Sequence, residues 1–291
     1  MTHIRLRLMI LAFSGLLAAV GLNVAMAVPA AAIPGLGNVS AATVIDSSVF
    51  KSVTAICPAG QRVIGGGARL TLTTGEVSIV YMAPNAGANG YEARAYEDFD
   101  GFAGNWGLVV TAICAPAPPG YAIVTAASPI GSPATASVTA TCPAGLQVLG
   151  TGGAVIPGRG VILLTGIMPS PQVGPTSVTV SGAEIAGGFI GTWNVQAWAI
   201  CAAPVAGLVV VPTAGIFDST SPKTLTSTCP VGRPVHGLGF VIVGGTGEIF
   251  LNAAFPNPAA PVGTSVPVAA SEDQTGFAGN WAIRTFAICA P

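Results

Sequence analysis

The chain has 291 residues, of which 51% are hydrophobic and only 7% are charged, and its formal net charge is −1. So little basic charge excludes the positive stripe with which nucleic-acid-binding proteins contact phosphates, and no nucleic-acid partner is expected. The 39 glycines and 24 prolines interrupt every helical period after the first segment, which favours short strands joined by turns.

The first segment has the features of a secretory signal. A basic start with Arg5 and Arg7 is followed by an uncharged apolar run from Leu8 and by a small-x-small site that ends at Ala27. We predict a signal peptide over residues 1–27, with cleavage after Ala27 or after Ala32. A retained anchor is the alternative, because the run approaches the length that spans a bilayer. After cleavage no transmembrane segment is expected, and the location is secreted or cell-envelope associated.

A motif of cysteine, proline, a small residue and glycine, followed by a glycine-rich stretch, occurs three times, starting at Cys57, Cys142 and Cys229. Each copy is followed by a tryptophan and a second cysteine: Trp106 and Cys114, Trp193 and Cys201, Trp281 and Cys289. Copies at a fixed period indicate a repeat architecture. We predict three β repeats over residues 35–116, 117–203 and 204–291.

Within a repeat, runs rich in Val, Ile, Thr and Ala alternate with turn-forming clusters. In the second repeat these runs predict strands near residues 121–127, 135–142, 147–156, 161–168, 177–183 and 193–201. The tryptophan and the second cysteine share one apolar face by period two, so both are expected in the core. The predicted fold is all-β, with three tandem disulfide-stapled antiparallel β-sandwich modules of about six strands each. A single three-fold β-prism is the alternative.

Six cysteines, two in each repeat, predict disulfides in an exported chain. Several pairings are open, and the simplest for a repeat protein are Cys57–Cys114, Cys142–Cys201 and Cys229–Cys289. Both cysteines of a repeat end their strands, so a bridge requires strands that are parallel neighbours or that face each other across a sandwich, and we favour the sandwich. The wide spacing offers no clustered zinc ligands, and no cofactor is expected.

The glycines after the first cysteine alternate along the strand, as in Val63, Gly65 and Gly67. Glycines repeated on one face indicate the close approach of a bulky group. We expect that group to be the tryptophan of the same repeat. A phosphate-binding loop is not indicated, because no helix and no Walker lysine follow.

Acidic residues also occur at matched positions, nine residues before each tryptophan: Glu97, Glu184 and Glu272. One hypothesis is a metal site, for example for calcium, formed in the first copy by Glu97, Asp98 and Asp100. The other is a carboxylate that accepts backbone N–H groups in the turn before the tryptophan strand. The turn role is favoured, since the middle repeat has Ile185 in place of the second acid.

Length varies between repeats only in the segments that follow Pro84, Pro169 and Pro256, and variable loops on a rigid scaffold are where recognition usually lies. In the first copy this segment offers candidate glycan-binding residues: Asn89, Tyr91, Glu92, Arg94 and Tyr96.

Two further residues and one carboxylate pair are functional candidates. Trp198 lies on the strand face opposite Trp193 and is either an exposed aromatic or a packing residue between repeats. His236 is the only histidine after the signal and replaces an apolar residue of the other repeats, so no catalytic triad is indicated. Glu92 with Glu97 or Asp98 is a candidate carboxylate pair for hydrolysis.

The pattern Cys-Pro-Ala-Gly-x-x-Val-x-Gly-Gly-Gly-Ala at residues 57–68, closing on Ala-Ile-Cys-Ala at 112–115, resembles the tandem repeats of secreted actinomycete-type bacterial proteins of unknown function. The resemblance covers the whole mature chain and implies no activity and no site residues. The third copy departs from it at Val231, Leu238 and Phe240. The repeat number and the Cys-Pro-x-Gly turns are also similar to the three-fold β-prism of vitelline membrane outer layer proteins, an analogy of fold only.

These observations predict a secreted, non-catalytic binding or structural repeat protein of the cell envelope or the extracellular space. A cell-wall glycan or another envelope component is the expected partner, and the oligomeric state is not predicted. The alternatives are a glycan-binding, lectin-like protein and a glycoside hydrolase that uses loop carboxylates.

Overall fold

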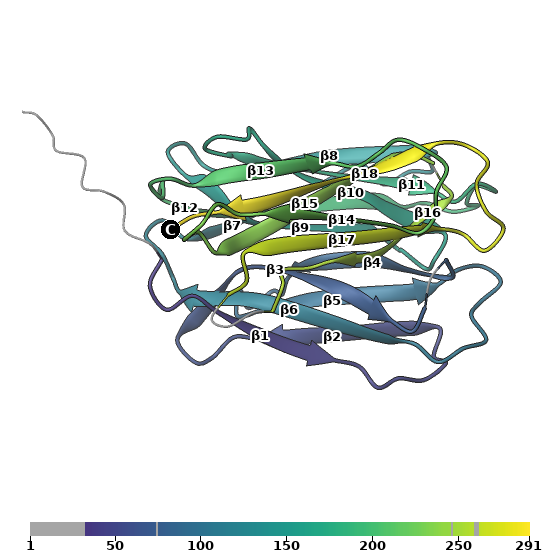
Figure 1. The fold of residues 1–291 in the computed structure, drawn as a ribbon, viewed down its shortest axis with the longest axis horizontal. Helices are drawn as coiled ribbons and strands as arrows, with labels where there is room; N and C mark the ends of the chain where they lie inside the picture. The colour runs from purple at the N-terminus through teal and green to yellow at the C-terminus, as the bar shows by residue number, and fades with distance from the viewer. Residues whose placement is uncertain (1–32, 74, 246, 259–261) are drawn as a thin grey trace, which may run out of the picture.

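The computed structural model describes residues 33–73, 75–245, 247–258 and 262–291, so the predicted signal peptide over 1–27 lies outside the described residues. The described residues form eighteen strands and no helix. Accordingly, this part of the chain has no helix with the length and apolar character to cross a membrane. The strands run along the long axis of the molecule (Figure 1).

Three six-stranded antiparallel sheets are present, and each combines strands of two repeats. The 1–3 sheet has the order β1 (Gly37–Ala42), β6 (Gly107–Pro116), β3 (Gln61–Thr71), β16 (Ile249–Ala254), β17 (Ser265–Glu272), β14 (Lys223–Thr228). The 1–2 sheet has the order β2 (Phe50–Ile56), β5 (Gly90–Glu97), β4 (Val77–Pro84), β9 (Gln147–Ile156), β12 (Asn194–Ala202), β7 (Ala122–Ala127). The 2–3 sheet has the order β13 (Val209–Ala214), β18 (Trp281–Cys289), β15 (Val235–Gly244), β10 (Ile162–Ser170), β11 (Ser177–Glu184), β8 (Thr135–Thr141).

Each repeat supplies six strands that divide between two sheets and face each other across a core. In the first repeat, β1, β6 and β3 pack against β2, β5 and β4. The strands of the second repeat fall within a few residues of the predicted ranges. The predicted fold class is therefore confirmed: the protein is all-β and fits three disulfide-stapled sandwich modules.

The three modules are also joined edge to edge into a closed ring. β3 pairs with β16 at Ala68 and Ala254, β9 pairs with β4, and β15 pairs with β10, so every repeat is joined to both of the others. This closure is what the three-fold prism alternative expected, and it coexists with the sandwich modules. Each third strand runs antiparallel to the fourth strand of a neighbour, and within a repeat the chain reverses between the third and the fourth strand. β3, β9 and β15 therefore all point the same way.

The shared strand direction gives the molecule two different ends. All three disulfides lie at one end, where the third strands begin, and we call this the disulfide end. The turns that carry the matched glutamates and precede the tryptophan strands lie at the other, which we call the acid end. The C-terminus lies at the disulfide end, on the left of Figure 1.

Three glycines bring the repeats together at the centre of the ring. A Cβ on Gly65 would lie 3.2 Å from Gly237 Cα, one on Gly150 would lie 2.9 Å from Gly65 Cα, and one on Gly237 would lie 2.7 Å from Gly150 Cα. The expectation that these glycines make room for the tryptophan of their own repeat was therefore wrong. They make room for the backbone of another repeat, which no side chain would permit.

The glycine strand also departs from strict alternation. Its register against β6 shifts between Val63 and Gly65, and β9 and β15 shift at the matching positions. A bulge leaves one residue unpaired and turns the following side chains to the other face. The predicted common face for Val63 and Gly65 was wrong for this reason.

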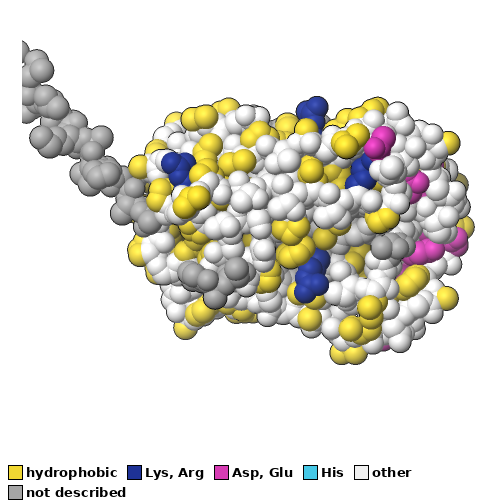
Figure 2. Space-filling view, viewed as in Figure 1, with side chains coloured by type: hydrophobic (Ala, Val, Ile, Leu, Met, Phe, Trp, Pro, Cys, Tyr) yellow, Lys and Arg dark blue, Asp and Glu magenta, His cyan; other side chains and the backbone are white. Residues whose placement is uncertain are grey.

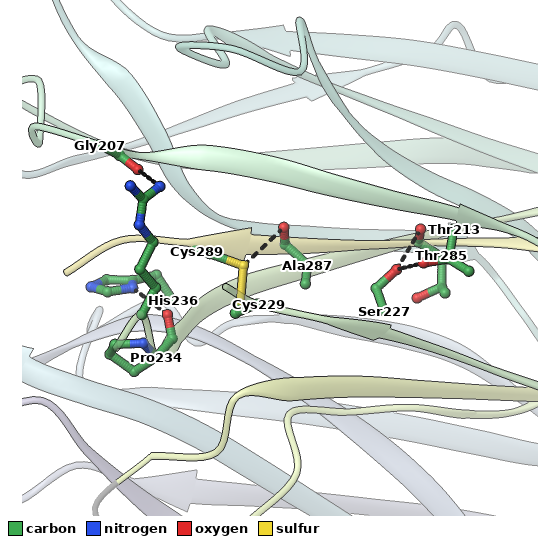
Figure 3. Close-up of a disulfide and its surroundings, with 10 residues drawn as sticks. Gly207, Thr213, Ser227, Cys229, Pro234, His236, Thr285, Ala287 and Cys289 are labelled. Atoms are coloured by element: carbon green, nitrogen blue, oxygen red, sulfur yellow. Dashed lines mark hydrogen bonds between the residues drawn. A yellow bond between two sulfur atoms is a disulfide. The ribbon is translucent and has the colours of Figure 1, made fainter. Parts of the chain in front are cut away.

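The disulfides connect Cys57 to Cys114, Cys142 to Cys201 and Cys229 to Cys289, with Cα–Cα distances of 5.6, 5.8 and 5.7 Å. The predicted pairing is confirmed. Each bridge joins the second and the sixth strand of a repeat, which belong to different sheets, so the sandwich arrangement was also right. Figure 3 shows the third bridge, with Pro234 and His236 beside it.

Candidate functional site

The matched glutamates hold the tryptophans in the core. In the first repeat Trp106 Nε1 donates to Glu97 Oε1 (2.8 Å) and the Phe102 backbone N–H donates to Glu97 Oε2 (3.2 Å). Glu184 accepts the matching bonds from the Trp193 indole (3.0 Å) and the Phe189 backbone N–H (3.2 Å) in the second repeat. Glu272 accepts them from Trp281 (2.8 Å) and Phe277 (3.1 Å) in the third. The turn role is confirmed, and each carboxylate has an indole donor besides the backbone donor that was expected.

The remaining acids of the first repeat form a separate group. Carboxylate oxygens of Glu76, Asp98 and Asp100 lie within 4.8 Å of one another. Burial, together with the charge of Asp100, raises the pKa of Asp98 to about 7, and burial also raises the pKa of Glu76. The structure thus brings Asp98 and Asp100 together with Glu76, which sequence reasoning missed, while Glu97 is bound to Trp106. Oxygen ligands of this kind suit a hard cation such as calcium, which remains a prediction.

The acid end is where the repeats converge. The tip of each β3–β4-type hairpin touches the acid turn of another repeat: Gly75 meets Glu272, Gly160 meets Glu97, and Gly247 meets Glu184.

A cavity of about 370 Å³ lies at this convergence, with Asp98, Asp100, Glu248 and Asp273 among its lining residues. Gln274 Nε2 donates to Asp100 Oδ2 across the repeats (2.6 Å). Figure 2 shows the acidic side chains gathered at one end of the visible face. The loops after Pro84 and Pro169, by contrast, lie at the disulfide end, each beside the first strand of the following repeat.

Two of the five predicted glycan-binding residues serve the fold. Tyr91 is fully buried, and its hydroxyl lies 2.9 Å from the Thr151 carbonyl and 3.2 Å from the Met82 carbonyl. Asn89 closes the β4–β5 loop, because its Oδ1 accepts from Asn85 Nδ2 at 2.9 Å. Alternation could have placed Tyr91, since it shares a strand face with Glu97, which reaches the buried tryptophan.

The other three, Glu92, Arg94 and Tyr96, lie on the outer face of the 1–2 sheet and are partly exposed. Arg94 Nε donates to Glu92 Oε1 (2.6 Å), and the Arg94 guanidinium lies 4.5 Å from the centre of the Tyr81 ring. Tyr96 packs on Phe50 with ring centres 4.5 Å apart. Through the contact of Arg94 with Tyr81, Glu92 and Arg94 therefore lie next to a larger surface feature, although they do not line it.

That feature is a groove of about 350 Å³ between repeats 1 and 2, which we call the Tyr81–Trp198 groove. The two rings lie edge to face, with centres 5.6 Å apart. Trp198 was noted in the sequence, whereas Tyr81 was missed because a bulge between Ile79 and Tyr81 sets its orientation. The other residues that line the groove are Pro84, Asn85, Ala86, Ala88, Ile123 and Thr125.

His236 is buried beside the third disulfide. Burial lowers its pKa to about 4, and its Nδ1 lies 3.2 Å from the Pro234 carbonyl. A neutral, enclosed imidazole of this kind is a packing residue, in line with the apolar residues at this position in the other repeats.

A scan of the chain against protein-family models finds no match, and a search of curated proteins finds none either.

Proposed function

We propose that this chain is an exported, non-catalytic protein of the cell envelope or the extracellular space, with a binding or structural role. The observation that carries the proposal is that the polar groups found in all three repeats stabilise the fold and do not face a ligand. The three matched glutamates hold buried tryptophans, so they stabilise the scaffold, and the residues left over for contact with a partner differ between repeats.

Oxidised cysteines support export. All six form disulfides within their repeats, a state that persists in oxidising compartments. Fractionation of the native host tests this: we expect the mature protein in the envelope or the medium, starting at Val28 or Ile33. A reduced protein in the cytoplasm would contradict the proposal.

The positions of the candidate carboxylates support a non-catalytic role. Glu92 lies on the outer face of β5 and Glu97 on its inner face, five residues further on, or roughly 16 Å along the strand. Glycoside hydrolases hold their two carboxyl groups about 5–9.5 Å apart across one bond. The pair Glu92 and Glu97 therefore fits hydrolysis poorly.

Asp98 keeps the hydrolase alternative testable, since its raised pKa and its neighbour Asp100 are features of a general acid. Purified protein should show no turnover of a panel of glycosides. Turnover that Asp98→Asn abolishes would replace the proposal with an enzyme.

Glycan binding is the second candidate, and the Tyr81–Trp198 groove favours it. An aromatic surface beside a charged pair and a hydroxyl suits a sugar, which has an apolar face and a polar rim.

A further inference from the structure

We propose that the Tyr81–Trp198 groove is a binding site for a neutral saccharide, about one or two sugar units of a longer glycan. The inference rests on the proposed function, because it names the ligand class of an exported binding protein. Three independent features of the groove lead to it.

The first feature is that the fold does not require these rings. Tyr81 follows the bulge of β4, and the residues at that point in β10 and β16 are Gly166 and Ala253. Trp198 lies three residues before its cysteine, where the other repeats have Thr111 and Phe286. The other two sheets form with Gly166 beside Phe286 and with Ala253 beside Thr111. Among the described residues, only the 1–2 sheet combines two aromatic rings at this place.

The second feature is how the two rings come together. They belong to different repeats, with Tyr81 on β4 and Trp198 on β12, and β9 runs between them. The β9 residues opposite them are Ala154, paired with Tyr81, and Gly152, paired with Trp198. These small residues let the rings lean toward each other over the strand. The joint between two repeats is thereby turned into a concave aromatic surface.

The third feature is a charged pair beside the groove, which contacts the Tyr81 ring without being part of the lining. Arg94 covers one side of the Tyr81 ring and bonds Glu92, which also accepts from Ser52 Oγ (3.2 Å). The matching positions are Thr179 and Ser181 in the second repeat and Pro267 and Ala269 in the third. The charged pair, like the ring pair, is therefore confined to the 1–2 sheet.

The chemistry of the groove selects a neutral sugar. A pyranose presents a face of C–H groups, which packs on an aromatic ring, and a rim of adjacent hydroxyls, which bonds to carboxylate and guanidinium groups. Thr125 adds an exposed hydroxyl on the other side. Glu92 offsets the charge of Arg94, so a phosphorylated or otherwise anionic ligand gains no net attraction.

Trp198 supplies a direct probe. The other three tryptophans, Trp106, Trp193 and Trp281, are buried with at most 1% exposure, whereas Trp198 is partly exposed. Iodide quenching of the intrinsic fluorescence should therefore report mainly on the groove. We expect soluble neutral oligosaccharides, tested as a series of hexose and N-acetylhexosamine polymers, to protect Trp198 from the quencher. A proline-rich peptide, the other occupant that aromatic grooves accept, should give no protection.

The repeats themselves supply substitutions that the other sheets already carry at the matching positions. Tyr81→Ala and Trp198→Thr install the residues of the 1–3 sheet, and Tyr96→Ala is the matched control, an aromatic on the same face that packs on Phe50. By calorimetry or by retention on insoluble polysaccharide, the first two should weaken saccharide binding at least tenfold, and the control should change it less than twofold.

The proposal is overturned if no saccharide protects Trp198, if a proline-rich peptide binds the groove instead, or if Tyr81→Ala and Trp198→Thr bind as the native protein does. Saccharide binding that survives both variants would place the site elsewhere and leave the proposed function standing. Turnover of the bound saccharide would remove the proposed non-catalytic function while leaving the site.

Discussion

The two ends of the molecule are built differently, although the same three repeats form both. At the disulfide end, a covalent bridge closes each repeat, glycines in backbone contact join one repeat to another, and His236 is buried there without charge. At the acid end, the carboxylates Glu76, Asp98 and Asp100 crowd together, and Phe99, Ile190 and Phe217 are exposed. Every acidic residue except Glu92 lies at the acid end. The disulfide end is thus specialised for stability, and the acid end bears unfavourable charge that the rest of the fold must offset.

The largest effect is expected from removing a bridge at the disulfide end. The double change Cys142→Ser and Cys201→Ser frees a loop of nearly sixty residues and should lower the free energy of unfolding by about 4 kcal/mol. Chemical denaturation measures the loss. A change below about 1 kcal/mol would contradict the idea that the bridge stabilises the fold by restricting the unfolded chain.

The next effect concerns pH at the disulfide end. The pKa of His236 is lowered from 6.5 to about 4 in the fold, so the unfolded chain binds more protons between these values. Stability should therefore fall as the pH drops from about 6.5 to 4, by about 3 kcal/mol. His236→Leu, which installs the residue of the second repeat, should remove this dependence. Equal pH profiles for both proteins would contradict the assignment.

A smaller loss of stability is expected from a substitution at the acid end. The Glu184 carboxylate accepts hydrogen bonds from the Trp193 indole N–H and the Phe189 backbone N–H. In Glu184→Gln, the amide NH2 faces one of these two donors, so that hydrogen bond is lost. We expect a loss of about 2 kcal/mol, measured by thermal unfolding. Thr179→Ala, a change on the outer face of the same strand, is the control and should cost far less.

The smallest effect on stability is expected from Asp98→Asn, and it should be a gain rather than a loss. The pKa of Asp98 is raised to about 7, so its ionised form destabilises the fold, and stability should decline as the pH rises from about 4 through 7. Asp98→Asn should then stabilise the protein at pH 8, by no more than about 1 kcal/mol because the group is partly solvated, and should be neutral at pH 4. If the variant is less stable at pH 8, the carboxylate has a favourable partner, such as a bound cation.

The sequence predicts features that lie within one repeat better than contacts between repeats. The strands, the three bridges, the inward tryptophans and the turn role of Glu97 followed from comparing repeats, because each depends on local pattern and matched spacing. The contact of Gly65 with Gly237 did not follow, since pairing between repeats leaves no local signal.

The candidate groove could not be predicted either, because a local irregularity of the backbone sets the orientation of Tyr81. The bulge before Tyr81 changes which face the ring occupies, and a bulge cannot be read from composition. Glu92 and Arg94 were candidates because they lie in the segment of variable length, and their role in binding stays a prediction. Tyr91 was a candidate for the same reason, although alternation with Glu97 places it inside.

Closure of the ring has a consequence for how the chain reaches its native state. β3, in the first repeat, finds its second neighbour only when β16 is available, so the contact spans about two thirds of the sequence. Long-range pairing of this kind slows folding. Until the last repeat arrives, β3 is an open edge able to pair with another chain. Deleting any one repeat should therefore leave two such edges and favour aggregation over a smaller soluble protein.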